Sequence, residues 1–349
     1  MKLPPVTILL SSYNGEKFVT EQVASIQHQT HPNWTLLVRD DGSRDRTLEI
    51  VQALSRADPR IVILTDARGN LGAAGSFGVL LEHVLRLDAP YVALADQDDL
   101  WCPAKIAREL ELMLRREQQA GPRKPLLVHS DLSVVGHDLT PVHRSFLKYQ
   151  GLSHEAKFPL GRLLLQNFVT GSTVLLNRSL LESATPVPDV IMHDWWLALC
   201  AAALGEIVFL PEATVLYRQH GGNAVGSFGL KHSVGESLRD PIASWHRADA
   251  LLDRAVAQAR ELLRRVEREE QRHPADAQAL QVLRAFTGAF AEGNGLTRLR
   301  VLARYGIRPR TFLPFPIRFY AGVLLWSPKL QTPATPGSVG TPGRVQDSR

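Results

Sequence analysis

The chain has 349 residues, 44% of them hydrophobic and 21% charged, which is the composition of a globular protein with a sizeable buried core. Its two cysteines, Cys102 and Cys200, exclude a disulfide framework and favour a reducing, cytoplasmic environment. The net charge of +5 arises between Arg247 and Arg310, where 13 Arg residues stand against 8 Asp and Glu residues.

The N-terminal hundred residues alternate between short apolar runs and helical patterns. The first apolar run, Val6 to Leu10, is too short for a secretory signal and predicts a strand, and no run approaches the roughly 20 apolar residues that span a bilayer. Further strands are predicted over 35–38, 61–64 and 91–95, with helices over 16–28, 47–54 and 76–87. This alternation indicates a parallel sheet covered by helices on both faces.

Polar clusters follow three of these strands, at Ser11 to Asn14, Asp40 to Ser43 and Asp96 to Asp99. In sheets of this kind, ligands bind at the carboxyl ends of the strands. The three clusters therefore predict one ligand site at a single edge of the sheet.

The rest of the chain divides into three predicted parts. Strands over 126–135, 172–176, 207–210 and 214–216 and helices from 103 and over 193–204 complete a first domain, 1–240, in which the irregular segment 140–160 lines the acceptor side. A helical, Arg-rich extension follows over 241–328, interrupted near 273–274 and ending in the apolar and aromatic segment 311–326. The tail, 329–349, is rich in Pro, Gly, Ser and Thr and is predicted to be disordered.

The segment Asp96-Gln97-Asp98-Asp99 places three carboxylates at a strand end, where they repel one another unless a cation is bound. A hard divalent cation is commonly held by one or two carboxylates together with substrate phosphates. Capping of the next helix would explain Asp99 but not all three aspartates. The cluster therefore predicts a metal site that neutralises a departing diphosphate.

The segment from Asp40 to Asp45 has the pattern of a turn with a helix cap, and a carboxylate there can also accept the imide proton of a uracil or thymine ring. Because Ser12-Tyr13-Asn14 and the acidic cluster lie at the same predicted edge, we interpret the segment as part of a nucleotide pocket. The glycine-rich stretch from Asn70 to Gly78 lacks the dinucleotide-binding spacing, and it either approaches a diphosphate or sugar or allows close helix packing.

Two further motifs lie beyond the predicted sheet edge. Asp194 precedes an apolar helix, either as its N-cap or as a general base for an acceptor hydroxyl, with Trp195 and Trp196 as a sugar-stacking surface. Arg218 and His220 follow a strand and are each candidates to reach a departing diphosphate. His220 is also a candidate metal ligand, in addition to Asp96 and Asp98, and the alternative for it is a purely structural role.

Taken together, these motifs resemble glycosyltransferase family 2 over roughly residues 5 to 225. The Asp-Gln-Asp-Asp-x-Trp and Tyr-Arg-Gln-His-Gly versions are most similar to its bacterial rhamnosyltransferase-like branch. The matching segments are Ser12-Tyr13-Asn14-Gly15, Asp40-Asp41-Gly42-Ser43-Arg44-Asp45, Asn70-Leu71-Gly72, Asp96-Gln97-Asp98-Asp99, Gly171-Ser172, His193-Asp194 and Tyr217-Arg218-Gln219-His220-Gly221.

The resemblance implies a GT-A type nucleotide-diphospho-sugar transferase fold, a mixed, mainly parallel sheet flanked by helices, and inversion at the anomeric carbon. It implies that Asp40 or Asp41 contacts the pyrimidine, that Asp98, helped by Asp96, holds Mn²⁺ or Mg²⁺, and that Asp194 deprotonates the acceptor. His193 stands where the family often has a glutamate. The expected donor-binding residues are Ser12, Tyr13, Asn14, Glu16, Asp40, Asp41, Ser43, Asn70, Gly72, Asp96 and Arg218.

We therefore predict an inverting glycosyltransferase of bacterial surface polysaccharide biosynthesis. It would move a sugar, with rhamnose as the candidate, from a dTDP- or UDP-linked donor to a saccharide or polyprenyl-diphosphate-linked glycan. The basic extension would rest on the anionic inner face of the cytoplasmic membrane, or segment 311–326 would pack back on the first domain.

Three alternatives follow from the same residues. A sugar-binding or scaffold protein would keep the fold without activity. A nucleotidyltransferase would need a cationic loop after the first strand, and Ser11 to Glu16 contains no cation. Nucleic acid is not an expected partner, because no basic motif interleaved with aromatic residues is present.

Overall fold

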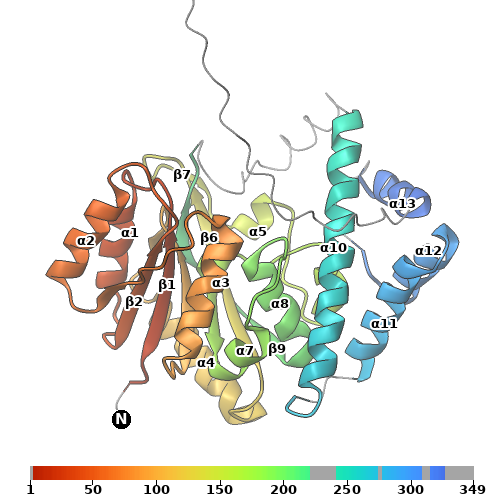
Figure 1. The fold of residues 1–349 in the computed structure, drawn as a ribbon, viewed down its shortest axis with the longest axis horizontal. Coiled ribbons are helices and arrows are strands. Elements are labelled where there is room, and N and C mark those ends of the chain that lie inside the picture. The colour runs from red at the N-terminus through yellow and green to blue at the C-terminus, as the bar shows by residue number, and fades with distance from the viewer. Residues whose placement is uncertain (1–2, 221–240, 274–276, 309–314, 327–349) are drawn as a thin grey trace, which may run out of the picture.

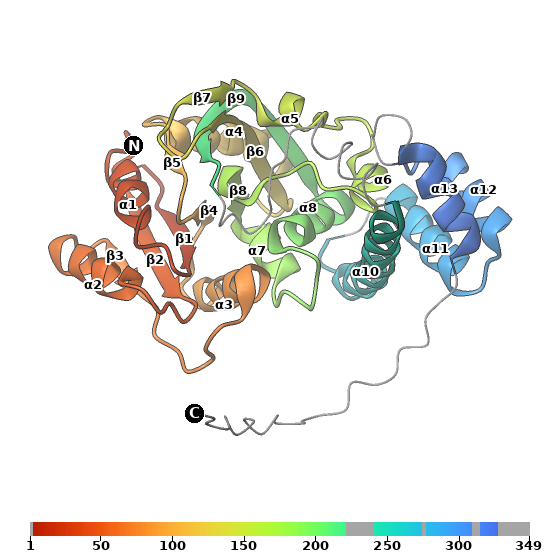
Figure 2. The ribbon, with the colours of Figure 1, turned by 90° about the horizontal axis from the view of Figure 1, so that it is seen from above.

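The computed structural model describes residues 3–220, 241–273, 277–308 and 315–326. A twisted sheet lies between two layers of helices (Figure 1). Helices α1 and α2 lie at one end of the molecule and α10 to α13 at the opposite end, as both ribbon views show (Figures 1 and 2). The disordered tail predicted over 329–349 lies outside the described residues.

The first half of the sheet is parallel, as the alternation of strands and helices predicted. Its strands lie in the order β3 (Ile61–Ile63), β2 (Trp34–Asp40), β1 (Val6–Ser12) and β4 (Tyr91–Asp96). Helices α1 (Val19–Gln27), α2 (Thr47–Ala57) and α3 (Gly72–Leu85) connect them. In the register of these strands, Ser12 pairs with Asp40 and Ser11 pairs with Asp96, so the predicted polar clusters share one edge.

The second half makes the sheet mixed. Strand β8 (Val174–Asn177) runs antiparallel to β4 and to β6 (Leu126–Val135), and β9 (Glu206–Arg218) runs parallel to β6. Strands β5 (Leu100–Trp101) and β7 (Pro141–His143) add antiparallel edges. The strands predicted over 207–210 and 214–216 are parts of one strand, β9. Its register with β6 shifts between Leu210 and Ala213, where Pro211 has no backbone N–H, and this bulge interrupts the apolar pattern.

Further helices complete the described part of the first domain. They are α4 (Lys105–Ala120), α5 (Phe146–Tyr149), α6 (Pro159–Leu163), α7 (Arg178–Ala184) and α8 (His193–Leu204), with a 3-10 turn at Gly171–Thr173. The segment predicted to be irregular, 140–160, thus contains β7 and α5. Because β5 intervenes, α4 begins at Lys105 and Asp99 does not cap it, contrary to the capping alternative.

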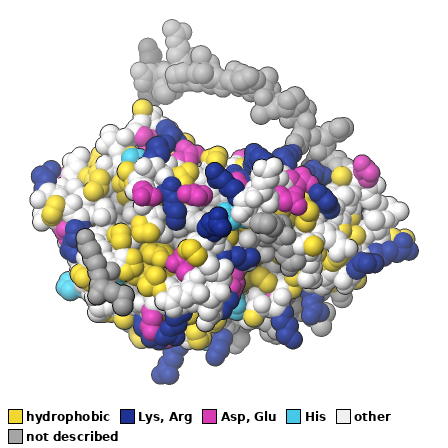
Figure 3. All heavy atoms as spheres, turned by 90° about the horizontal axis from the view of Figure 1, so that it is seen from below, with side chains coloured by type: hydrophobic (Ala, Val, Ile, Leu, Met, Phe, Trp, Pro, Cys, Tyr) yellow, Lys and Arg dark blue, Asp and Glu magenta, His cyan; other side chains and the backbone are white. Residues whose placement is uncertain are grey.

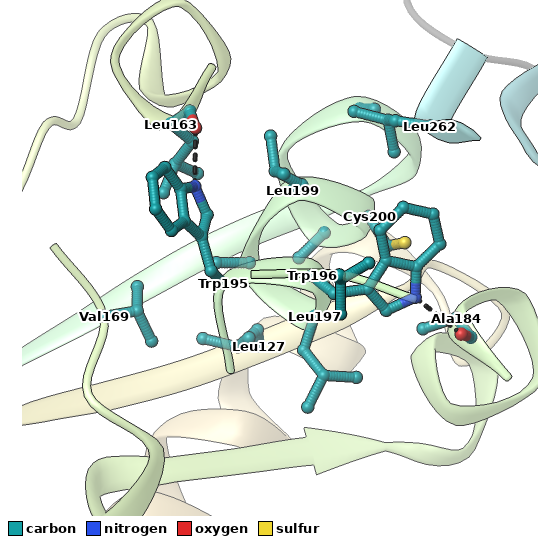
Figure 4. Packing of buried hydrophobic residues seen from close by; sticks show 14 of the residues in the cluster. Leu127, Leu163, Val169, Ala184, Trp195, Trp196, Leu197, Leu199, Cys200 and Leu262 are labelled. Atoms are coloured by element: carbon teal, nitrogen blue, oxygen red, sulfur yellow. Dashed lines mark hydrogen bonds between the residues drawn. The ribbon is translucent and has the colours of Figure 1, made fainter. Parts of the chain in front are cut away.

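Side chains alternate between two cores on opposite faces of the sheet. In β1, Ile8 and Leu10 pack with α1, α2 and α4, whereas Leu9 packs with α3, α7 and α8. Helix α8 is buried almost all round, and its indole N–H groups donate to carbonyls: Trp195 to Leu163 O at 2.6 Å and Trp196 to Ala184 O at 2.8 Å (Figure 4). The predicted sugar-stacking role is therefore wrong for Trp196, which is fully buried.

The C-terminal extension consists of α10 (Pro241–Glu269), α11 (Ala277–Ala291), α12 (Gly295–Arg304) and α13 (Phe315–Leu325). Its core is continuous with that of the first domain, because Leu262 of α10 and Phe286 of α11 belong to the cluster that surrounds α8. In α13, Val323 is buried, and Trp326 just after it is also buried and donates to Asp253 Oδ1 at 2.6 Å. One face of the described end of the predicted segment 311–326 therefore packs onto the other helices, whereas residues 311–314 lie outside the described residues.

Some of the extension's arginines are structural. Arg265 is buried and donates to the carbonyls of Ser183, Thr185 and Pro186, and Arg298 is buried beside the end of α13. On the face seen in Figure 3, Lys and Arg side chains are dispersed, with Asp and Glu side chains among them. Within the described residues, none of the helices combines the length and apolarity required to cross a bilayer.

Candidate active site

A cavity of about 660 Å³ lies at the carboxyl ends of β1, β2 and β4, between α3 and α8. Its walls include the turn that precedes β8 and residues of α5 and β9. The cavity brings together residues that the sequence predicted from five separate motifs, namely Tyr13, Asp41, Asn70, Gly72, Asp96, Asp98 and Asp194.

Other predicted donor-binding residues lie beside the cavity and hold its wall. Asp40 accepts hydrogen bonds from Ser12 Oγ at 3.1 Å and from Ser43 N at 2.9 Å. Asn14 N donates to Ser43 Oγ at 2.9 Å, and Glu16 accepts from Arg46 N at 3.1 Å. These contacts tie the loop after β1 to the loop after β2.

Asp41, the neighbour of Asp40, is buried at the cavity wall. Its carboxylate accepts the backbone N–H groups of Leu71 at 2.9 Å and Gly72 at 2.8 Å, at the start of α3. Gly72 has a φ of +69°, a conformation that glycine adopts without strain. The glycine-rich stretch thus contributes the N-terminus of α3 to the site. Gly78, further along the same helix, does not line the cavity and packs close to Val187.

Arg39 was missed by the sequence reasoning. It is buried, forms an ion pair with Asp41, and donates from Nε to Asp66 Oδ2 at 2.7 Å and from Nη2 to Gly69 O at 2.8 Å. It therefore fixes Asp41 and the loop before α3. The signal was a cation inside an otherwise apolar strand, since a buried cation requires partners.

The acidic cluster contains two kinds of aspartate. Asp96 and Asp98 line the cavity, and burial together with the negative charges of Asp98 and Asp194 raises the pKa of Asp96 to about 7. Asp99 is buried away from the cavity and accepts Arg218 N at 3.2 Å, and burial raises its pKa well above the ordinary value. The cavity thus holds carboxylates that repel one another.

Arg218 does not line the cavity. It is buried, donates from Nε to Asp98 O at 3.1 Å and from Nη1 to His137 O at 2.9 Å, and forms an ion pair with Glu21. Its position therefore supports the backbone of the acidic cluster. His220 lies closer to the predicted metal site, because its Nε2 is 2.9 Å from Asp98 Oδ2 and its ring stacks on Phe18.

These residues fit a cation that is held jointly with a bound ligand. Among the described residues, no group of three or more His, Cys, Asp and Glu side chains could hold a metal ion. However, Asp96 and Asp98 offer carboxylate oxygens in one cavity, and a divalent cation would relieve the repulsion that, after burial, raises the pKa of Asp96. Such cations commonly take one or two carboxylates and complete their shell with substrate phosphates and water.

Asp194 lies in the first turn of α8, and the N-cap of that helix is Met192, so Asp194 is not the N-cap. Its Oδ2 accepts Gly171 N at 2.9 Å, and its Oδ1 accepts Trp195 N at 2.6 Å and Asn167 Nδ2 at 3.3 Å. Burial raises the pKa of Asp194 to about 6 although the backbone donors oppose this shift. The result is a fixed carboxylate that is ionised at neutral pH and is more basic than an exposed one.

The comparisons with known proteins agree with this geometry. Residues 7–124 match the model of glycosyl transferase family 2. The Escherichia coli protein WfgD, a UDP-Glc:alpha-D-GlcNAc-diphosphoundecaprenol beta-1,3-glucosyltransferase, is 30% identical over 195 residues, which are 56% of this chain and 68% of that protein. The chain belongs to glycosyl transferase family 2, and its mixed sheet between helices is of the GT-A type predicted from the sequence.

Other relatives are more distant. The dTDP-rhamnosyl transferase RfbG of Shigella flexneri is 24% identical over 245 residues, which are 69% of this chain and 81% of that protein. The mannosyltransferase PcManGT of Pyrobaculum calidifontis, solved with GDP-Man and Mn²⁺, is 19% identical with a TM-score of 0.47, covering 91% of this chain and 84% of that one. The chain spans between 63% and 68% of the length of three of the curated relatives that it matches.

Proposed function

We propose that this chain is an inverting glycosyltransferase that moves a sugar from a pyrimidine nucleoside-diphosphate donor to the hydroxyl group of a saccharide acceptor. The observation that supports the proposal most strongly is a single cavity in which the buried carboxylate of Asp194 lies with the acidic pair Asp96 and Asp98. Acceptor activation and diphosphate departure need a base and a counter-charge in one site.

The donor nucleotide would bind at the wall formed by β1, β2 and α3. Tyr13 exposes 44% of its surface at this wall and offers a ring face for a base. Asn70, Gly72 and Asp41 line the same wall, and Arg39 holds Asp41 in place. Ser12, Asn14, Glu16, Asp40 and Ser43 would act through this wall, because their contacts fix the loops that form it.

Asp194 would remove the proton of the acceptor hydroxyl as the new bond to the anomeric carbon forms. Its backbone and Asn167 contacts fix the carboxylate, and its raised pKa increases its basicity. Asp96 and Asp98, with His220 beside Asp98, would hold Mn²⁺ or Mg²⁺. The bound cation would supply positive charge that neutralises the departing diphosphate. Arg218 would keep Asp98 in place through its backbone.

The names of two relatives support the finer assignment. RfbG is a dTDP-rhamnosyl transferase, and WfgD acts on a diphosphoundecaprenol-linked sugar. We therefore propose a dTDP- or UDP-linked donor, with rhamnose as the first candidate sugar, and a polyprenyl-diphosphate-linked glycan as the acceptor. The product would belong to a bacterial surface polysaccharide.

A lipid-linked acceptor would place the enzyme at the inner face of the cytoplasmic membrane. Leucines of α12 and α13 are exposed, namely Leu296 at 60%, Leu324 at 42% and Leu325 at 75%. They lie together, because Gly295 approaches the backbone of Leu324 so closely that a Cβ there would lie 2.4 Å from its carbonyl oxygen. The same α12 helix carries the exposed Arg300 and Arg304, so apolar and cationic groups suit an anionic lipid surface.

Release of free nucleoside diphosphate from a panel of dTDP-, UDP- and GDP-sugars, with Mn²⁺ and a saccharide acceptor, tests the proposal. We expect release from one pyrimidine donor in the wild-type protein and release that is slower by about 10² to 10⁴ in Asp194→Asn. If no donor is consumed and Mn²⁺ does not tighten UDP or dTDP binding, the chain is a sugar-binding or scaffold protein instead.

Flotation with liposomes tests the membrane assignment. We expect the full chain to float with anionic vesicles and a Leu296→Ser, Leu324→Ser, Leu325→Ser variant to remain behind. A chain truncated near Arg310 that floats as well as the full chain would show that α13 is not needed for the attachment.

A further inference from the structure

His193, at the start of α8, is a buried polar side chain that has no hydrogen-bond partner among the described residues. It is 3% exposed and lines the cavity beside Asp194. Neither Nδ1 nor Nε2 has a hydrogen-bond partner within the part of the chain that the structure describes. A buried polar group in this state destabilises a folded protein, so its presence at the cavity wall calls for a partner that binds there.

Packing alone does not explain a histidine at this position. The ring stacks on Phe77 of α3, with centroids 4.0 Å apart and planes at 20°. A phenyl ring would make the same stack without burying two unpaired nitrogens. Burial lowers the pKa of His193 to about 3, so the ring is neutral at physiological pH and carries one donor and one acceptor.

The structure also keeps space next to one of these nitrogens. Gly171 lies opposite the ring, and a Cβ at that position would lie 3.2 Å from His193 Nε2. Gly171 has no positive φ that would itself require glycine. A side chain there would crowd Nε2, so glycine at this position keeps the cavity wall beside the ring free of a side chain.

We propose that His193 is a specificity-determining residue that hydrogen-bonds a hydroxyl group on the sugar ring of the donor. The inference rests on the proposed function. A neutral imidazole and a sugar hydroxyl can each donate or accept, so one pairs well with the other. The donor is the partner, rather than the acceptor, because the ring stacks on α3, the helix whose N-terminus with Gly72 lines the proposed donor wall.

His193→Phe tests this inference by binding rather than turnover. The variant keeps the stack on Phe77 and removes both nitrogens. We expect its affinity for the consumed nucleotide-sugar, measured by calorimetry with Mn²⁺, to fall about tenfold or more, while its affinity for the free nucleoside diphosphate is unchanged. The Tm of the free protein should stay the same or rise, because two unpaired groups are no longer buried; a purely structural histidine would lower it.

A second variant and a matched control keep the test decisive if His193→Phe does not fold. Gly171→Ala retains the histidine and fills the space beside Nε2, so it should also weaken the nucleotide-sugar and not the nucleoside diphosphate. His129→Phe is the control, because His129 is buried, has an unpartnered Nδ1 among the described residues, and does not line the cavity. It should change neither affinity.

A nucleotide-sugar affinity that is the same in His193→Phe and wild type would overturn the inference while leaving the proposed function intact. If the KM for the acceptor also rises in that variant, His193 hydrogen-bonds the acceptor instead of the donor. Failure of the wild-type protein to bind any nucleotide-sugar would instead refute the proposed function, and this inference with it.

Discussion

The side chain of Gln97 makes two hydrogen bonds with the backbone of Tyr13. Tyr13 N donates to Gln97 Oε1 at 2.8 Å, and Gln97 Nε2 donates to Tyr13 O at 3.0 Å. The pair joins the loop after β1 to the loop after β4. Gly15 leaves room for it, because a Cβ there would lie 2.2 Å from Gln97 Oε1. The exposed ring of Tyr13 therefore depends on Gln97 for its place at the cavity mouth.

Gln97→Ala should lower the affinity for the nucleoside diphosphate by up to about thirtyfold, because Tyr13 loses both contacts at a cost of about 1 kcal/mol each. Gly15→Ala should have a similar effect by displacing the amide. Calorimetric titration measures both, with Gln119→Ala, on the exposed end of α4, as the control. Wild-type affinity in Gln97→Ala would mean that Tyr13 is not part of the nucleotide site.

Removal of divalent metal should abolish transfer, and added Mn²⁺ or Mg²⁺ should restore it, because the repelling pair Asp96 and Asp98 needs a counter-charge to accept a diphosphate. Asp98→Ala should lose both the metal-dependent gain in nucleotide affinity and transfer, and added metal should not rescue it. Asp138→Ala is the control, since this exposed carboxylate lies outside the cavity. If Asp98→Ala still binds nucleotide in a metal-dependent way, the cation site does not include Asp98.

Asp194→Asn should keep the donor affinity of the wild-type protein and lose transfer by a factor of about 10² to 10⁴, the usual contribution of a general base. The amide cannot take the proton, although it can still accept one of the hydrogen bonds from Gly171 and Trp195. Parallel measurements of nucleotide-sugar binding and diphosphate release separate the two effects. Substantial turnover by this variant would reject Asp194 as the base.

The pH dependence of transfer follows from the same carboxylate. Because its pKa in the free protein is about 6 and the ionised form is active, kcat/KM should fall about tenfold per pH unit below pH 6 and should be level above it. Burial raises this pKa above the ordinary 3.8, so ionised Asp194 destabilises the fold as pH rises from about 4 to 6, by about 3 kcal/mol in all. Asp194→Asn should therefore gain stability relative to wild type over that interval, as urea denaturation at pH 4 and pH 7 would show.

The sequence predicted the site better at the level of motifs than of side chains. Strand ends were predictable from apolar runs, and parallel pairing then brought the polar clusters to one edge. The sequence could not predict which of two adjacent aspartates faces the cavity. Consecutive residues at a strand end point to opposite faces, and Asp40 and Asp41 differ in no local property. Asp41 lines the cavity, whereas Asp40 binds Ser12 and Ser43.

Other residues of the site depend on contacts that local patterns do not carry. Asn167 holds Asp194 from a segment without regular structure, and nothing in its neighbourhood distinguishes it from a loop asparagine. The basic pattern of the extension likewise mixes two kinds of arginine. Arg265 and Arg298 are buried on backbone carbonyls, and Arg300 is exposed, although all three occur in similar helical sequence.

A buried ion pair within α4, on the face that packs against the sheet, allows a test of the fold alone. Lys105 Nζ lies 2.6 Å from Glu109 Oε2, with the two side chains 0% and 1% exposed. Glu109 Oε1 also accepts from Ser130 Oγ at 3.1 Å. Lys105→Met should lower the free energy of unfolding by about 3–5 kcal/mol, because it leaves a carboxylate buried without its counter-charge. Chemical denaturation measures this loss.

The double variant Lys105→Met, Glu109→Leu should recover most of that stability, since no charge then remains buried and Ser130 keeps its 2.6 Å hydrogen bond with Thr214. Arg115→Ala, which removes an exposed pair with Glu111, should cost less than about 1 kcal/mol and serves as the control. A double variant as unstable as Lys105→Met would mean that the loss comes from packing around Trp101, whose ring lies 4.4 Å from Lys105 Nζ, rather than from the unpaired charge.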